Sequence, residues 1–506
     1  MNSASRATLR TKTGCLTCRK RRKKCDERLP VCDGCHLSGR HCQWPSLGDL
    51  LDRRFASHNR SRHNQPQMAM AHFKALDTRV DLERATFSDT STVHEMISGD
   101  PEPVVLRHFF ESFYSLLLLP NCHPGFYNGW LGEIQNLIVH HKGLYYSVLA
   151  CAASHIYLVN SSSQMQELAL TYYANSIQEL VRFLTRASQP ENDNGLLISI
   201  MLLCLQGCYG CDTYADVPHH VAAATHILAM RLLGRPWRIT RPFDRLAIES
   251  VLYQIFLVTT GLWSDSTGFY DDFYADFWAQ SERLLGQSTL FPTCSASHNS
   301  PVLGVPVSLF RVTLSLRQQC RSRVSCDQAS LDLMQSEVEA WEAGLRRGQQ
   351  LDFSSTSELP NEQERYYKDA GHLYAIIASV LLEHLSGNKT STGATPTASK
   401  DSWQVRKAVQ ILRRYQHDDG WARLFIGNWP VYTLGLLVSS PKDMELVQAD
   451  LRQRWDLTKF AQISRFSHDL EETWAARKQV ADTVLQSCWD RETILVWESL
   501  AKWRPL

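Results

Sequence analysis

The chain has 506 residues, of which 44% are hydrophobic and 21% are charged, and its formal net charge is +1. This composition is typical of a globular protein with at least one large core, and it excludes a chain that is disordered throughout. The longest apolar runs, such as Leu196–Leu205, are shorter than the roughly 18 residues of a membrane span, so we expect no membrane partner. The first residues show no apolar stretch typical of a secretory signal, so we expect an intracellular protein whose 15 cysteines stay reduced.

The near-neutral total charge conceals a strong asymmetry along the chain. Residues 1–45 contain 11 Lys and Arg against 3 Asp and Glu, a formal charge of +8. The remaining residues contain 42 basic and 49 acidic side chains, a formal charge of −7. A basic head on an acidic body indicates a polyanionic partner for the head, which begins with a basic N-terminal arm over residues 1–14.

Six of the 15 cysteines fall within the first 42 residues, in the pattern C-x2-C-x6-C-x6-C-x2-C-x6-C. The second half of this pattern repeats the first at an offset of 17 residues. Structural zinc takes four ligands, so six thiolates satisfy two zinc ions only if two of them bridge both metals. By the internal symmetry the bridging pair should occupy equivalent positions, and Cys15 with Cys32 fits. The predicted metal ligands are Cys15, Cys18, Cys25, Cys32, Cys35 and Cys42.

This spacing resembles that of the fungal zinc binuclear cluster (Zn₂Cys₆) transcription factors, and it matches at every cysteine. The resemblance implies two Zn²⁺ ions bridged by Cys15 and Cys32, with each half a short helix followed by an extended strand. It identifies residues 15–42 as a small metal-stabilised DNA-binding domain. The function implied is a nuclear, sequence-specific regulator of transcription by RNA polymerase II whose partner is double-stranded promoter DNA.

Six consecutive cations follow the second cysteine, whereas the second half of the pattern contains only Arg40. We therefore expect the first half to face DNA, because arginine and lysine read guanine edges and neutralise phosphates. The resemblance places base reading of CGG-type triplets at Arg21 and Arg22, where family members commonly have lysine. A nuclear localisation signal is an alternative reading of the run, and both roles together are favoured. The predicted DNA-binding residues are Arg19, Lys20, Arg21, Arg22, Lys23 and Lys24.

Residues 43–99 are polar and irregular, and we interpret them as a linker. Ala69, Phe73, Leu76 and Val80 follow a 4-3-4 spacing, which Glu83 interrupts. Two heptads are fewer than a coiled coil usually needs, so a short helix for homodimerisation and an ordinary surface helix remain open alternatives.

Residues 100–506 show helical periodicity almost throughout and no sustained alternation, which predicts a large all-α domain. Its segments HFFESFY, LACAASH and LLCLQGCYGCDTYADVPHHVAAATHIL resemble the fungal-specific transcription factor domain, also called the middle homology region. The resemblance implies a regulatory domain that contacts a coactivator or corepressor. Control of a biosynthetic gene cluster is the implied role, with a nutrient-pathway regulator or a repressor as the alternative.

Three local patterns have a second interpretation. Cys204, Cys208 and Cys211 with His219 and His220 have the residue types of a metal site, although a buried helix is favoured. The DDFYAD segment, residues 271–276, is similar to a metal motif of terpene cyclases, whose second motif is absent, so we expect no enzyme. The mixed acidic and aromatic residues of Ser264–Trp278 suit an activation segment, but packing on the body is favoured.

Overall fold

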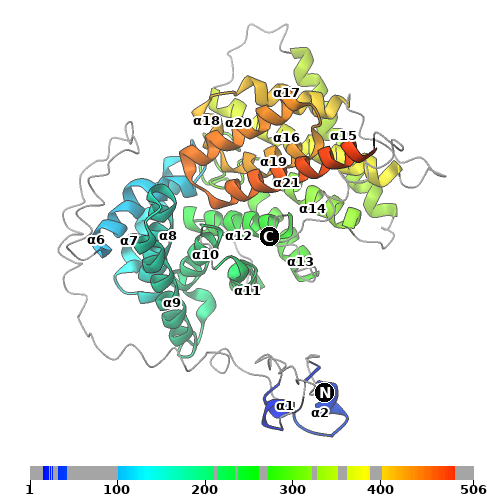
Figure 1. Cartoon of the computed structure of the whole chain (residues 1–506). Coiled ribbons are helices and arrows are strands. Elements are labelled where there is room, and N and C mark those ends of the chain that lie inside the picture. Colours follow the sequence, from blue (N-terminus) through cyan, green and yellow to red (C-terminus); the bar gives the residue numbers. More distant parts are fainter. Residues whose placement is uncertain are drawn as a thin grey trace, which may run out of the picture. The chain divides into compact units, whose positions relative to one another are not determined.

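The computed structural model describes the chain in two parts, a cysteine-rich head and a helical body (Figure 1). In the head it describes residues 15–21, 23, 25–26 and 32–42. In the body it describes residues 101–209, 213–233, 238–260, 272–321, 328–351, 362–387 and 402–484. The predicted N-terminal arm, the linker with its dimerisation helix, and Arg22, Lys24 and Cys211 lie outside these ranges.

The head contains two short helices, α1 (Leu16–Lys20) and α2 (Asp33–His36). The first half of the body contains α6 (Glu102–His108), the π-helix η3 (Phe109–Phe113), η4 (Tyr114–Leu117), α7 (Pro124–Ile138), α8 (Lys142–Asn160), α9 (Ser163–Leu184), η5 (Pro190–Asn192), α10 (Asn194–Tyr209), η6 (Tyr214–Asp216), α11 (Val217–Leu233) and α12 (Pro242–Thr260).

The second half contains α13 (Asp272–Gly286), α14 (Val307–Arg321), α15 (Gln328–Leu351), α16 (Glu362–Gly387), α17 (Trp403–Arg414), α18 (Asp419–Ala422), η7 (Phe425–Gly427), α19 (Asn428–Leu437), α20 (Pro441–Thr458) and α21 (Ala461–Val484). No β-strand occurs within the described ranges. A small cysteine-rich domain followed by a large all-α domain is therefore confirmed. None of the described helices combines the length and apolarity needed to cross a membrane.

The core of the body is built on helices that are apolar around most of their circumference. In α8, α12 and α19 most side chains are buried, including polar ones such as Ser147 and Thr433. A helix that is apolar all round must be enclosed by other helices. By contrast, α17 has one apolar and one polar face, and its N-terminus is capped by the hydroxyl of Ser402, which accepts from the Val405 N–H.

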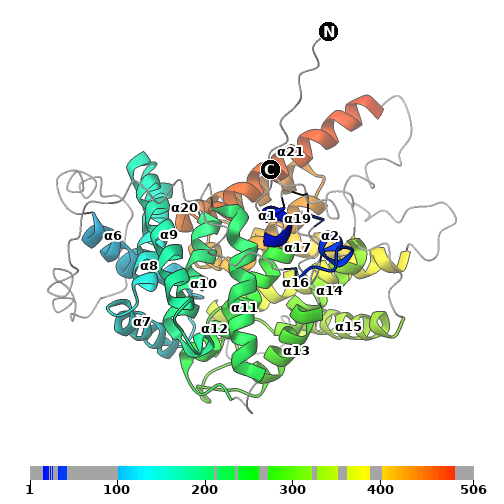
Figure 2. The same ribbon diagram turned by 90° about the horizontal axis from the view of Figure 1, so that it is seen from below.

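The body contains two groups of helices that meet at α12 (Figures 1 and 2). The helices α6 to α11 form the first group, in which α10 packs between α8 and α11. The helices α14 to α21 form the second group, in which α16 packs against α14, α15 and α17. Helix α12 contacts α7, α10 and α11 of the first group and α14 of the second. The two halves of the body therefore share one core.

A buried carboxylate attaches the loop before α14 to α12. The Glu249 side chain, 1% exposed, accepts from the Arg245 Nε at 2.8 Å through its Oε1. Its Oε2 accepts from the Ser300 Oγ at 2.7 Å and from the backbone N–H groups of Val302 and Leu303 at 3.0 and 3.1 Å. A carboxylate that accepts four hydrogen bonds is well compensated for its loss of water.

The aromatic residues of Ser264–Trp278, the candidate activation segment, pack into the body where the structure describes them. Tyr274, Phe277 and Trp278 of α13 are 7%, 2% and 1% exposed, so their rings serve the core. This agrees with the favoured interpretation that the segment packs on the body. Residues 264–271 of the segment lie outside the described ranges.

Candidate metal centre and nucleic-acid interface

Each half of the head places two cysteines at the start of a short helix. Cys15 immediately precedes α1 and accepts through its Sγ from the Cys18 N–H at 3.3 Å. Cys32 holds the equivalent place before α2, which contains Cys35. The residues after α2 form a turn and then run to Cys42 without a β-ladder. The sulfurs of Cys15 and Cys18 therefore lie at the start of α1, and those of Cys32 and Cys35 lie at the equivalent place in α2.

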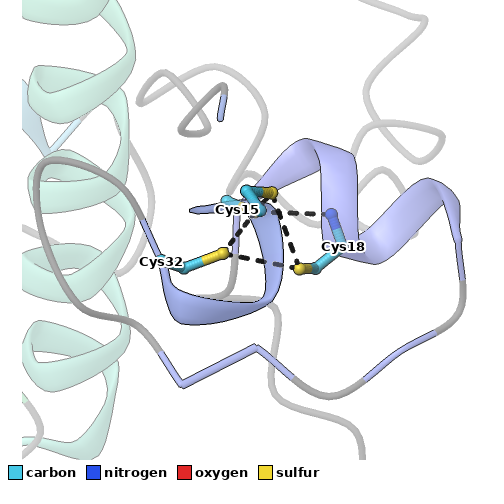
Figure 3. A group of neighbouring side chains, drawn as sticks. Cys15, Cys18 and Cys32 are labelled. Carbon is cyan, nitrogen blue, oxygen red and sulfur yellow. Dashed lines mark hydrogen bonds between the residues drawn. The ribbon is translucent and has the colours of Figure 1, made fainter. Parts of the chain in front are cut away.

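The sulfurs of Cys15, Cys18, Cys32 and Cys35 lie within 4.8 Å of one another, and all four residues are almost fully buried. Figure 3 shows three of them, Cys15, Cys18 and Cys32, with their sulfurs directed toward one another. Cys15 lies 3.7 Å from both Cys32 and Cys35, measured between Sγ atoms. Cys18 lies 3.6 Å from Cys32 and 4.0 Å from Cys35. A tetrahedral zinc site with Zn–S bonds of about 2.3 Å has S–S edges of about 3.8 Å. The donor set and the spacing therefore both fit thiolate-bound zinc.

The remaining two predicted ligands lie at the edge of this group. Cys25 and Cys42 are partly buried and pack against the other four cysteines. The Cys25 sulfur, the Cys32 sulfur and a carboxylate oxygen of Asp26 lie within 4.8 Å of one another. The Cys42 sulfur accepts from the Cys32 N–H at 3.4 Å. Cys32 is therefore close to cysteines of both halves of the pattern.

Without a metal ion, the surroundings of Cys18 and Cys35 keep their thiols protonated. Burial raises the pKa of Cys18, and burial with the neighbouring thiols raises the pKa of Cys35 to about 12. Burial by itself raises the pKa of the Cys32 thiol as well. Hydrogen bonds, chiefly from the Cys35 N–H, outweigh burial there and lower the pKa overall. A zinc ion would replace the protons of these thiols and supply the positive charge that the sulfurs share.

Two polar side chains that the sequence pattern did not single out join the halves of the head. The Thr17 hydroxyl donates to the His41 carbonyl at 2.9 Å. The Asp26 carboxylate accepts from the Asp33 N–H at 3.0 Å, at the first residue of α2. Each falls close to a cysteine in the sequence, but neither has a distinctive spacing that would have identified it.

The basic run continues from α1 into the turn that follows it. Lys20 and Lys23 are exposed, and Arg21 is half-buried. The Arg21 Nη1 donates to the Ser38 hydroxyl at 3.3 Å, and that hydroxyl donates to the Gly34 carbonyl at 2.7 Å. Arg21, proposed from the sequence as a base reader, thus contacts the second half of the head in this structure.

The alternative metal sites in the body are not assembled among the residues that the structure describes. Cys204 is 1% exposed on α10, and its thiol faces the Val217 carbonyl at 3.9 Å. His220 instead forms a hydrogen bond of 2.7 Å with the Tyr173 hydroxyl. The potential metal-binding groups found in the described ranges are all in the head. The favoured interpretation of Cys204 as part of a buried helix agrees with its position.

Comparisons with known proteins identify both parts of the chain. Residues 13–47 match the fungal Zn(2)-Cys(6) binuclear cluster domain, and residues 104–501 match the fungal specific transcription factor domain. Both are domains of transcription regulators, which confirms the prediction of a regulator in place of an enzyme.

Curated relatives match mainly through limited segments. An uncharacterized transcriptional regulatory protein of Schizosaccharomyces pombe is 68% identical over 37 residues, 7% of each chain. The aspercryptin biosynthesis cluster-specific transcription regulator of Emericella nidulans is 23% identical over 243 residues, 46% of this chain and 37% of that protein. The pestheic acid cluster transcriptional regulator 3 of Pestalotiopsis fici is 26% identical over 191 residues, 29% of this chain and 34% of that protein.

These matches thus span well under half the length of each of the three relatives. The fungal specific transcription factor domain, however, extends over more than half of the present chain, and the cysteine-rich head precedes it. The chain therefore belongs to the fungal zinc binuclear cluster transcription factors that contain this domain.

Proposed function

We propose that the chain is a zinc-dependent, sequence-specific DNA-binding regulator of transcription by RNA polymerase II that acts in the nucleus. The observation that carries this proposal is the gathering of buried cysteine sulfurs in the head, beside exposed Lys20 and Lys23. The Cys15–Cys32, Cys18–Cys32 and Cys15–Cys35 distances of 3.6 to 3.7 Å are those expected between two sulfurs that share a zinc ion. Zinc–thiolate bonds supply the folding free energy of such short segments, and the folded segment then presents its cations to phosphates and bases. The dense cation run also suits a nuclear import signal.

The metal content that we propose is two zinc ions, bridged by Cys15 and Cys32. Cys15, Cys18 and Cys25 would complete the first site with Cys32, and Cys35 and Cys42 would complete the second with the two bridging cysteines. The contacts of Cys32 with Cys15, Cys18 and Cys25 support the first set. The contacts of Cys35 with Cys15 and of Cys42 with the Cys32 N–H support the second.

The DNA surface that we propose is the basic run from Arg19 to Lys24, within residues 15–42. Arg21 and Arg22 would read guanine edges of CGG-type triplets, and the other cations would contact phosphates. Successive residues of a helix point about 100° apart, so six consecutive side chains cannot all enter one groove. The exposed positions of Lys20 and Lys23 suit phosphate contacts, which demand less precise geometry than base contacts.

The pathway that we propose is a biosynthetic gene cluster. Two relatives that align with parts of the chain are described by name as cluster regulators, one for aspercryptin and one for pestheic acid. The helical body, residues 100–506, would be the regulatory domain and would bind a coactivator or corepressor. Residues 43–99 would connect the body to the head and contribute to a homodimer.

The proposal is tested by selecting binding sites for the purified full-length chain from a random oligonucleotide pool. We expect enrichment of CGG triplets, and we expect Cys18→Ser to abolish it, because Cys18 contributes to the four-sulfur group. Cys204→Ser is the matched control, since that cysteine lies in the body and should leave the enriched sequence unchanged. Failure to enrich any sequence, or enrichment by Cys18→Ser equal to that of the unchanged chain, would refute a zinc-dependent reader.

A further inference from the structure

A cavity of about 90 Å³ lies inside the helical body, where the two groups of helices meet. Its wall comes from η4, α7, α10, α11, α12 and the start of α21, together with the segments around Val302 and Phe425. Most of this wall is apolar, including Leu117, Met201, Val221 and Leu257. The cavity is partly open to the surface, and Leu257 of its wall is half-buried.

Three polar side chains in this wall each contain one buried atom without a hydrogen-bond partner. These atoms are Trp130 Nε1, Gln254 Oε1 and Gln462 Nε2. The three side chains are 2%, 8% and 8% exposed. The Gln254 Nε2 donates to the Met201 carbonyl at 3.4 Å, which fixes its Oε1 as the atom left to accept. An unsatisfied buried polar atom costs about 1–3 kcal/mol, so three in one cavity wall call for a partner.

The chemistry of these atoms defines what that partner must be. Two of them donate and one accepts, so a matching molecule needs both an acceptor and a donor. None of the described residues that line the cavity is charged, and an unpaired ion would be costly to bury here. A closed apolar cavity of about 150 Å³ holds the six heavy atoms of benzene, so by proportion the present one encloses about four heavy atoms, and its open side leaves room for a fifth.

We propose that this cavity is a binding site for a small neutral molecule with a short apolar body and a polar end that both accepts and donates, such as a primary amide. Trp130 and Gln462 donate to its oxygen, and its N–H donates to Gln254. These residues lie on α7, α21 and α12, so the bound molecule connects both groups of helices. The inference goes beyond DNA binding and does not depend on it.

Propionamide is the probe for this site, and butanone is its matched control. The two molecules have the same heavy-atom skeleton, but butanone has a methyl group in place of the amide nitrogen and cannot donate. Binding is measured on the full-length chain by ligand-observed saturation-transfer NMR over millimolar concentrations. We expect propionamide to bind about tenfold more tightly than butanone, the effect of one hydrogen bond of about 1.4 kcal/mol.

Three variants locate the binding. Gln254→Met and Gln462→Met are close in size to glutamine and remove the polar atoms, so each should reduce propionamide binding toward that of butanone. Leu257→Trp fills the cavity from its half-buried side and should abolish binding of both probes. Circular dichroism verifies that each variant is folded. Equal binding of the two probes by the unchanged chain, or propionamide binding that persists in Leu257→Trp, would overturn the proposal.

Discussion

Arg21 is the residue of the basic run whose side chain connects the two halves of the head. Its hydrogen bond to the hydroxyl of the exposed Ser38 is worth about 0.5–1.5 kcal/mol. A bidentate contact with guanine contributes about 1–3 kcal/mol of discrimination, so DNA can displace Ser38. We therefore expect Arg21→Ala to lose about 1–3 kcal/mol on the preferred site and clearly less on scrambled DNA, measured by titration of both duplexes. Equal losses on both duplexes would show that Arg21 is not a reader.

Two kinds of control accompany Arg21→Ala. Ser38→Ala removes the intramolecular partner and should leave the affinity for both duplexes nearly unchanged. Lys20→Ala and Lys23→Ala remove exposed cations and should weaken binding to both duplexes alike. Each should also lower the slope of log K against log salt by about 1, because one phosphate contact releases about one counterion.

Glu249 is a buried residue whose loss should destabilise the body strongly. In Glu249→Gln the amide oxygen can accept from Ser300, Val302 and Leu303, but the N–H₂ group then faces the Arg245 Nε–H, and the opposite orientation leaves the other three donors without an acceptor. Breaking a buried ion pair costs about 3–5 kcal/mol, so the urea midpoint, followed by far-ultraviolet circular dichroism, should fall clearly. Glu282→Gln is the matched control: its pair with Arg311 is 28% and 29% exposed, and such pairs contribute at most about 1 kcal/mol. Similar midpoints for the two variants would contradict this account.

The metal ligands and the buried carboxylate differ in how far the sequence could predict them. The six cysteines repeat at an offset of 17 residues, and a coordination number then restricts how they combine. Glu249 has no such signal, because its partners follow 51 to 54 residues later in a loop without a motif. The contact of Arg21 with Ser38 was missed for the same reason, since the pattern locates cations but not their neighbours.

Among the helices, periodicity predicted most of the body but not its irregular turns. Residues 104–119 belong to the range whose periodicity predicts helix almost throughout. In the structure this stretch changes from α6 to the π-helix η3 and then to η4, which ends at Leu117. Phe109 and Phe113, both within η3, are fully buried in this arrangement. Only packing against neighbouring helices selects among these helix types.

Helices α6 and α8 are joined by two histidines that should make stability depend on pH. The His108 Nε2 and the His155 Nδ1 lie 2.8 Å apart, and the His155 Nε2 lies 3.3 Å from the Thr458 carbonyl at the end of α20. Burial lowers the pKa of His108 to about 4. Burial, followed by the neighbouring His108, lowers the pKa of His155 to about 3. Both rings are therefore neutral in the folded chain at neutral pH.

The sign of the effect follows from proton uptake. Below pH of about 6.5 the unfolded chain binds protons on these histidines while the folded chain does not. The free energy of unfolding should therefore be highest above pH 6.5. It should fall toward pH 4, by up to about 1.4 kcal/mol per pH unit for each histidine. The measurement is urea unfolding of the full-length chain between pH 7.5 and 4.5.

A double variant, His108→Gln with His155→Gln, should flatten this dependence, because glutamine forms hydrogen bonds without titrating. His468→Gln is the control: His468 is 55% exposed beside Glu472, and its replacement should leave the pH dependence unchanged. An unchanged slope in the double variant would show that other groups cause any acid sensitivity.

For the whole molecule, the division into a metal-stabilised head and an all-α body followed from the sequence. Cysteine spacing and cation density are local properties, and helical periodicity is local as well. The cavity could not be predicted, because Trp130, Gln254 and Gln462 are more than 100 residues apart in sequence and meet only through packing. A glutamine in an amphipathic run gives no sign of whether its amide will find a partner.

Removal of zinc should unfold the head and leave the helical body folded. We expect elemental analysis of the full-length chain to give two zinc ions, and Cys18→Ser to reduce this number. Chelation should abolish sequence-specific DNA binding, because the metal–thiolate bonds supply the folding free energy of the head. The circular dichroism signal at 222 nm should change little, since the described helices of the head, α1 and α2, are only 5 and 4 residues long. Cys204→Ser is the matched control and should retain both zinc ions and DNA binding, because that thiol is buried in α10 of the body and belongs to none of the potential metal-binding groups of the described residues. A single zinc ion per chain would contradict the bridged cluster, and specific binding that survives complete chelation would contradict the role of zinc in folding the head.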